Sequence, residues 1–193
     1  MNVLLIFLGA ALINNVILSY ALGIRGMMNQ SNHLKSAFRF GLIVSVVMML
    51  SGLVVFPIHR FVLYPMGITS FNLIVFVLVI VGWVQLVGIF LKKIQPAFAG
   101  EFDTIRPLIM ANSAILGMVL LGVGQFNNHL GLAMVYTVGT ATGFTLVMVL
   151  FAGIWGRIQY NEISPYFKGI PIAMIAAGLM AIVFFGFTGL FSQ

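Results

Sequence analysis

Four polar side chains interrupt stretches of the sequence that are otherwise apolar. Asn14 and Asn15 fall near the middle of the first apolar stretch, and Asn112 with Ser113 fall in the fourth. An amide in apolar surroundings is costly unless it is hydrogen-bonded, so such residues either join helices or form a polar site. These four residues are our candidate midplane polar site. Hydrogen bonding between neighbouring helices is the alternative interpretation.

Other reactive groups are scarce. The chain has no cysteine, which excludes disulfides, thiolate-bound metals and a cysteine nucleophile. The three histidines share no metal-ligand spacing and are expected at the surface near loops. We place the three carboxylates in loops, outside the apolar stretches: Glu101, Asp103 and Glu162. We therefore predict no catalytic residue, no metal site and no cofactor held by this chain.

The composition identifies the surroundings in which these residues act. Of the 193 residues, 62% are hydrophobic and 6% are charged, whereas about a quarter of a soluble domain is charged. A membrane-spanning helix needs about 20 apolar residues, so the chain has room for about six. The net charge of +6 then encodes orientation in the lipid bilayer, and no nucleic-acid partner is expected.

The predicted spans lie near residues 3–24, 37–58, 71–91, 107–123, 131–153 and 170–190. Eight of the nine Lys and Arg residues fall in the first, third and fifth connections between them. The positive-inside rule therefore places these connections in the cytoplasm and both termini outside a bacterial-type cytoplasmic (inner) membrane. By this rule Arg25 is one more anchor on the cytoplasmic side. Its neighbours Gly23 and Gly26 allow the backbone to turn there.

The two halves of the chain resemble each other. Asn15 aligns with Asn112, and Val47–Leu50 aligns with Val147–Leu150 at a similar offset. Chance similarity among apolar residues is the alternative. Because each half holds three spans, the halves have opposite orientations. We predict one all-α integral membrane domain over residues 1–193, with six transmembrane helices as two inverted three-helix repeats, about 1–95 and about 104–193. The first and fourth helices are the candidates for interruption.

Longer motifs extend the comparison to a known family. They are Asn14–Asn15 with Leu22–Gly23, Pro107–Ile109 with Asn112 and Ala114–Gly117, Gly143–Ala152, Phe167–Gly169, Ala177–Met180 and Gly186–Phe187. In order and spacing, over nearly the whole chain, they resemble the RnfA and NqrE type of membrane subunit. Such subunits belong to Rnf complexes and to sodium-pumping NADH:quinone oxidoreductases.

The resemblance implies a six-helix inverted repeat that pairs with a homologous six-helix subunit of opposite topology. In that family the two subunits hold a [2Fe–2S] cluster between them, with a Cys from the first and fourth spans of each. Electrons then cross the membrane between flavin or iron–sulfur subunits, coupled to Na⁺ or H⁺ movement. Here Arg25 and Ser113 stand at the two cysteine positions. We therefore expect no [2Fe–2S] cluster on this chain, and flavin or iron–sulfur groups on partner subunits.

The leading functional hypothesis is a transmembrane subunit of an Rnf/Nqr-type electron-transport complex that lacks the two cluster-ligand cysteines. The alternatives are a transporter or channel subunit that uses the region of Asn15 and Asn112, or a scaffold that anchors other subunits. Interrupted helices with a polar cavity favour transport. A dry, continuous helix pair favours scaffolding.

Overall fold

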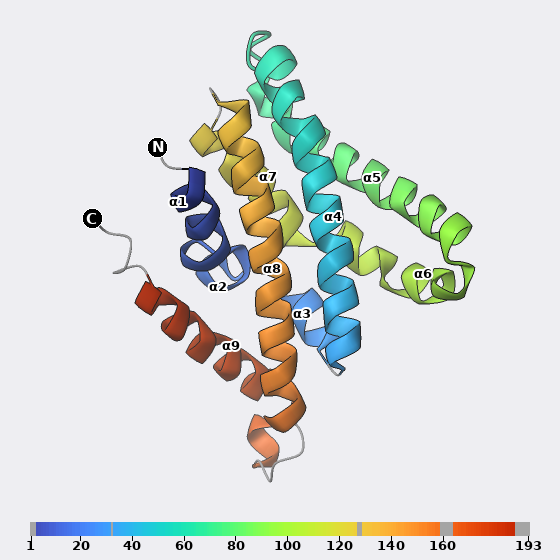
Figure 1. Ribbon diagram of the computed structural model, residues 1–193, viewed down its shortest axis with the longest axis vertical. Helices are drawn as coiled ribbons and strands as arrows, with labels where there is room; N and C mark the ends of the chain where they lie inside the picture. The colour runs from blue at the N-terminus through green and yellow to red at the C-terminus, as the bar shows by residue number, and fades with distance from the viewer. Residues whose placement is uncertain (1–2, 32, 127–128, 159–163, 188–193) are drawn as a thin grey trace.

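Two long antiparallel helices form the centre of the molecule. The computed structural model describes residues 3–31, 33–126, 129–158 and 164–187, apart from the side chains of residues 96–99. Helix α4 (Leu34–Ile58) and helix α8 (Leu130–Ile158) lie side by side and run in opposite directions (Figure 1). Every regular element in the described part of the chain is a helix.

The other elements surround this pair. They are α1 (Val3–Leu8), a π-helical turn (Gly9–Ile13), α2 (Val16–Tyr20), α3 (Ile24–Gln30), a second π-helical turn (His59–Leu63), a 3-10 turn (Thr69–Phe71), α5 (Asn72–Ile94), α6 (Pro96–Met110), α7 (Ser113–Phe126), a 3-10 turn (Pro165–Phe167) and α9 (Ile170–Phe185). The predicted second, third and fifth apolar stretches are confirmed as helices long and apolar enough to cross a membrane, over Leu34–Leu63, Thr69–Ile94 and Leu130–Ile158.

The remaining predicted stretches are shorter or broken in the structure. Gly100–Met110 and Ser113–Phe126 form a pair bent by 47°, which makes up a fourth candidate span among the described residues. Val3–Ile13 and Ile170–Phe185 are apolar helices below the length of a span. The sequence therefore located the apolar segments, while the first segment divides into α1, α2 and α3 within residues 3–30.

Small side chains allow α4 and α8 to approach closely. The Ser45 hydroxyl donates to the Ala141 carbonyl at 2.6 Å and lies 2.7 Å from the Thr145 hydroxyl. A Cβ on Gly41 would lie only 3.2 Å from the Thr145 Cα. Hydroxyl bonds of this kind, together with small residues, hold helices together in an apolar solvent that provides no hydrophobic drive between them.

The opposite face of α8 packs against the start of the chain. A Cβ on Gly139 would lie 2.6 Å from the Phe7 carbonyl oxygen, and one on Gly143 would lie 2.7 Å from the Ala11 Cα. The backbone of α1 and its π-helical turn therefore contacts the backbone of α8 directly. Gly139 and Gly143 are four residues apart and so share one face of α8, which is the small-residue spacing that allows helices to pack this closely.

One ion pair joins the first and third connections, and two more lie within the third. Arg39 bonds to Glu101 at 3.0 Å, and Asp103 bonds to both Lys92 at 2.8 Å and Arg106 at 3.0 Å. Glu101 and Asp103 were predicted in a loop, but both lie within α6, because that helix begins as early as Pro96. The third acid, Glu162, lies outside the described residues.

One histidine also departs from the expected surface position. His59 is buried in the turn that continues α4, with its ring 6.2 Å from that of Tyr64 and 6.3 Å from that of Phe76. Helix α4 continues into a π-helical turn at this point, which brings the ring back over aromatic neighbours. His59 is therefore part of the apolar core.

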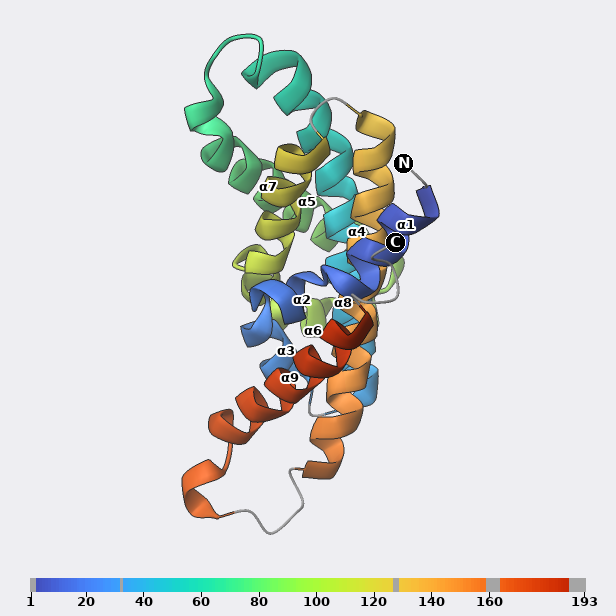
Figure 2. The ribbon, with the colours of Figure 1, turned by 90° about the vertical axis from the view of Figure 1, so that its left-hand side faces the viewer.

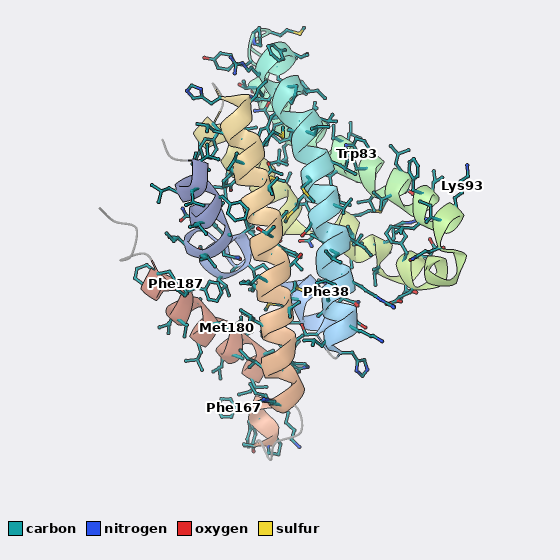
Figure 3. All side chains as sticks on the ribbon, in the orientation of Figure 1. Phe38, Trp83, Lys93, Phe167, Met180 and Phe187 are labelled. Carbon is teal, nitrogen blue, oxygen red and sulfur yellow. The ribbon has the colours of Figure 1, made fainter. Side chains whose placement is uncertain are left out.

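The outer helices expose large apolar side chains. Most of α5 and α9 is uncovered, including Leu78, Phe90 and Ile182. Helix α9 lies at an angle to α8 (Figure 2), and Lys93 marks the end of α5 beside the turn to α6 (Figure 3). Such surfaces suit lipid or neighbouring subunits rather than water.

Candidate functional site

The first break in the helices is at Asn14–Asn15. Asn15 is 1% exposed, and both polar atoms of its side chain are hydrogen-bonded. Its Oδ1 accepts from the Ile17 backbone N–H at 3.1 Å, which caps α2, and its Nδ2 donates to the Ala11 carbonyl at 2.9 Å. The side chain thus replaces helical bonds that the break removes.

A second break separates α2 from α3. Ala21 adopts a left-handed conformation with φ of 55°, and Gly23 follows with φ of 81°. A Cβ on Gly23 would lie 3.0 Å from both the Ala114 Cβ and the Asn112 Oδ1. Glycine is required here for two reasons, since it accepts the positive φ and leaves room for the other half of the molecule.

The third break separates α6 from α7. The Asn112 Oδ1 accepts from the Ala114 backbone N–H at 2.9 Å, the same bond to residue i+2 that Asn15 makes with Ile17. Pro107 lies three residues before the end of α6 and provides no N–H to its helix. Asn112 is 6% exposed, and its Nδ2 is buried without a hydrogen-bond partner in the described part of the chain.

The breaks of the two halves meet. The Gly23 backbone N–H donates to the Ser113 Oγ at 2.9 Å, which joins the α2–α3 bend to the first residue of α7. Leu22 packs directly on Gly117 of α7. Between α3, α6 and the start of α7 lies a cavity of about 540 Å³, whose lining includes Arg25, Asn112 and Ser113.

The cavity has several polar side chains in a partly apolar lining, and it carries positive charge. Its polar lining comes from Asn29, Gln30 and Thr104 in addition to Arg25, Asn112 and Ser113. Arg25 is the charged side chain among its described lining residues, and none of these is a carboxylate. The nearby acid Asp103 bonds to Lys92 and Arg106 instead. Arg25 and Ser113 are exposed, so the cavity opens to the surface of the molecule.

The structure divides the four residues of the predicted polar site. Asn112 and Ser113 lie together in the cavity, where Arg25 joins them. Asn15 is buried beside Ala11 and does not line this cavity. Asn14 is exposed and lines a separate pocket of about 450 Å³ against α9. The structure therefore brings Asn112 and Ser113 together with Arg25, and it does not bring Asn14 or Asn15 to the same cavity.

Comparison with known proteins identifies the family. The model of the Rnf-Nqr subunit family, described as a membrane protein, matches residues 3–191. The chain belongs to the Rnf-Nqr subunit family. The RnfA subunit of the ion-translocating oxidoreductase complex of Yersinia enterocolitica is 38% identical over 187 residues, which cover 97% of this chain and 96% of that protein. The proteins of the same name from Yersinia pestis and Edwardsiella ictaluri match equally well, at 38% identity over the same lengths.

The donor set of this Rnf-Nqr subunit can be tested against the cluster that the family resemblance implied. Iron–sulfur clusters are held by thiolates or, in some types, by histidines. The cavity offers instead the guanidinium of Arg25, which stays protonated, and the hydroxyl of Ser113, which accepts from Gly23. Cysteine is absent from the whole chain. The residues present do not fit a [2Fe–2S] cluster.

The residue types and their spacing did not predict most of the cavity lining. They predicted Arg25 as a cytoplasmic anchor, and only the family resemblance paired Arg25 with Ser113. Asn29, Gln30 and Thr104 carry no motif that marks them as neighbours. The one available signal was the pair of glycines around Arg25, because Gly23 and Gly26 both lie against Asn112.

Proposed function

We propose that this chain is the transmembrane subunit of an Rnf/Nqr-type electron-transport complex that couples redox chemistry to ion translocation. The observation that carries the proposal is the 38% identity to the RnfA subunit of the ion-translocating oxidoreductase complex, which extends over 97% of this chain. A match over the full length of both proteins includes the broken helices and the cavity. The chain itself contributes no catalytic residue, and the electron carriers are on its partners.

The fold we propose for this protein has six spans arranged as two inverted repeats. The antiparallel contact of α4 and α8 supports it, because Ser45 meets Ala141 while Thr145 meets Gly41. Adding 100 to Gly41 and Ser45 gives Ala141 and Thr145, so each contact is the counterpart of the other in the second half. The matching caps of Asn15 and Asn112 give similar support. Such reciprocal contacts are typical of a two-fold relation between halves.

The same proposal includes orientation and partners. The ion pair of Arg39 with Glu101 joins two of the three basic connections, the first and the third, and this supports cytoplasmic placement of that side in the inner membrane. Both termini then lie outside the cytoplasm. The exposed apolar faces of α5 and α9 provide room for lipid and for a homologous subunit of opposite topology.

The proposed electron path does not use a [2Fe–2S] cluster on this chain. The guanidinium of Arg25 and the hydroxyl of Ser113 support this part of the proposal, because neither is a thiolate ligand. Electrons then pass through flavin, haem or iron–sulfur groups of partner subunits, or they do not cross the membrane at this chain.

The experiment is gentle extraction of the tagged chain, followed by identification of co-purifying subunits and their bound flavin, haem and iron. We expect a second six-span homologue together with flavin or iron–sulfur proteins. Electron paramagnetic resonance of the complex should give no [2Fe–2S] signal that depends on this chain. Isolation of the chain with only non-redox partners contradicts the proposed function, and a cluster at its cavity contradicts the proposed electron path.

A second candidate function is transport without redox chemistry. The specific observation in its favour is the polar cavity of about 540 Å³ beside two interrupted helices, because transporters build midplane sites from broken helices. Purification without any redox partner, combined with solute or ion flux in vesicles that contain only this chain, supports this candidate over the first.

A further inference from the structure

The amide nitrogen of Asn112 is a buried donor with no acceptor in the described structure. The side chain cannot be reversed, because its oxygen is required to accept from the Ala114 N–H at 2.9 Å. The Nδ2 therefore points the other way, toward Gly26. A Cβ added to Gly26 would lie 3.7 Å from it. Gly26 and Asn112 both line the cavity. Buried polar groups nearly always have a partner, so the missing acceptor requires an explanation.

A second group of donors opens into the same cavity. Helix α7 has 14 residues and begins at Ser113, which lines the cavity, so the positive end of the α7 dipole lies at the cavity wall. The Ala114 N–H of this first turn is already bonded to the Asn112 Oδ1. The Ser113 Oγ already accepts from Gly23 at 2.9 Å. Its hydroxyl hydrogen therefore remains to be donated to another acceptor.

Charge completes the pattern. Arg25 adds a guanidinium with five donors and a permanent positive charge to the same wall. Among the described residues that line the cavity there is no carboxylate to neutralise it. Thr104 already donates its hydroxyl to the Gly100 carbonyl at 3.2 Å. A cation, an amide, a hydroxyl and a helix N-terminus thus belong to residues that line one cavity, and all of them donate hydrogen bonds.

We infer that this cavity binds a phosphate-type oxyanion. Several convergent donors suit a ligand with several acceptor oxygens, and a helix N-terminus combined with arginine is a common way of binding phosphate. The cavity of about 540 Å³ is wide enough for a hydrated phosphate or for the headgroup of an anionic phospholipid. Both sources offer the same phosphate oxygens to Arg25, the Asn112 Nδ2 and α7.

The inference rests on the proposed function only in placing this cavity in a membrane subunit. It is tested by binding, whereas the proposed function is tested by co-purifying redox partners. Either can therefore fail without the other.

The experiment uses the tagged chain with its co-purifying subunits in detergent. One arm measures inorganic phosphate binding by calorimetry, with sodium chloride at equal ionic strength as the reference. The other arm measures retained anionic phospholipid by native mass spectrometry. The informative variants are Arg25→Gln, which removes the charge, and Asn112→Asp, which keeps the oxygen that caps α7 but replaces the free donor with an acceptor.

We expect each variant to weaken binding by about tenfold to a hundredfold, the range for a hydrogen bond to a charged group. Asn14→Asp makes the same chemical change in the separate pocket and should leave binding unchanged. Phosphate binding assigns a free anion, and retention of phospholipid that the two variants abolish assigns a lipid headgroup. The inference is overturned if the unmodified protein binds neither, or if Arg25→Gln and Asn112→Asp bind as the unmodified protein does.

Discussion

Asn15 and Asn112 can be compared directly, because each caps a helix with its Oδ1. They differ in the hydrogen bonding of the side-chain nitrogen, Nδ2. Oδ1 of Asn15 and Oδ1 of Asn112 each accept from the backbone N–H of residue i+2. Nδ2 of Asn15 donates to the Ala11 carbonyl at 2.9 Å, whereas Nδ2 of Asn112 has no partner in the described structure. Replacement by alanine should therefore have unequal costs.

For Asn15→Ala, loss of the cap costs about 1 kcal/mol. The Ala11 carbonyl also loses the donor that Asn15 supplies, which costs about 1–3 kcal/mol at a buried position. The free energy of unfolding should then fall by about 2–4 kcal/mol. Hydrogen bonds inside membranes average nearer 0.6 kcal/mol, which favours the lower end of this range.

For Asn112→Ala, loss of the cap again costs about 1 kcal/mol. Removal of an unpartnered buried donor offsets this by a similar amount, so the net change should stay within about 1 kcal/mol. The assay is unfolding in mixed micelles by increasing dodecyl sulfate, in phosphate-free buffer, followed by the fluorescence of Trp83 and Trp155. Asn14→Ala is the matched exposed control, expected within about 0.5 kcal/mol. An equal or greater loss for Asn112→Ala than for Asn15→Ala refutes the reasoning.

The same titration checks three further predictions. Gly143→Ala should lower the free energy of unfolding by about 1–3 kcal/mol, because the added Cβ would clash with the backbone of Ala11. Gly153→Ala, on the same helix with nothing within 4 Å of the added Cβ, should raise it by about 0.5–1 kcal/mol. Equal effects of the two substitutions contradict the close packing of α8 against the start of the chain. Ser45→Ala should cost about 1 kcal/mol through its bond across the α4–α8 contact, and an unchanged midpoint would show that this bond contributes nothing. Arg39→Ala should cost under about 1 kcal/mol because its pair with Glu101 is exposed; a larger loss, insensitive to salt, contradicts this assignment.

The sequence predicted the long apolar helices well, because a continuous apolar stretch has few alternatives to a helix in a membrane. α5 was predicted over residues 71–91 and is found over Asn72–Ile94. The fourth apolar stretch was also predicted as a candidate for interruption, and it is broken before α7, where Asn112 caps the helix. These features depend on local chemistry that single residues express.

The division of the first segment at Ala21–Gly23 was not predicted. Gly23 and Gly26 allow a turn, but their spacing does not indicate that the helix already ends before Ala21, whose left-handed φ is stabilised by tertiary contacts. Those contacts come from residues about 90 positions away, including the bond from Gly23 to Ser113. The cavity depends on this long-range meeting, and so its lining could not be derived from spacing along the chain.

The two halves are similar in where their helices break. They differ in whether the capping asparagine has a partner for its Nδ2, and this difference falls at the cavity beside Arg25. In the first half the π-helical turn brings the Ala11 carbonyl to Asn15 and closes the amide within its own segment. In the second half no equivalent turn precedes Asn112, and α3 of the first half lies opposite it with Gly26 in place of a side chain. One asparagine is therefore structural, and the other keeps a donor for whatever enters beside Arg25. A functional site in a repeat fold is expected where the two copies stop being equivalent, because there a buried polar group has been left unpaired.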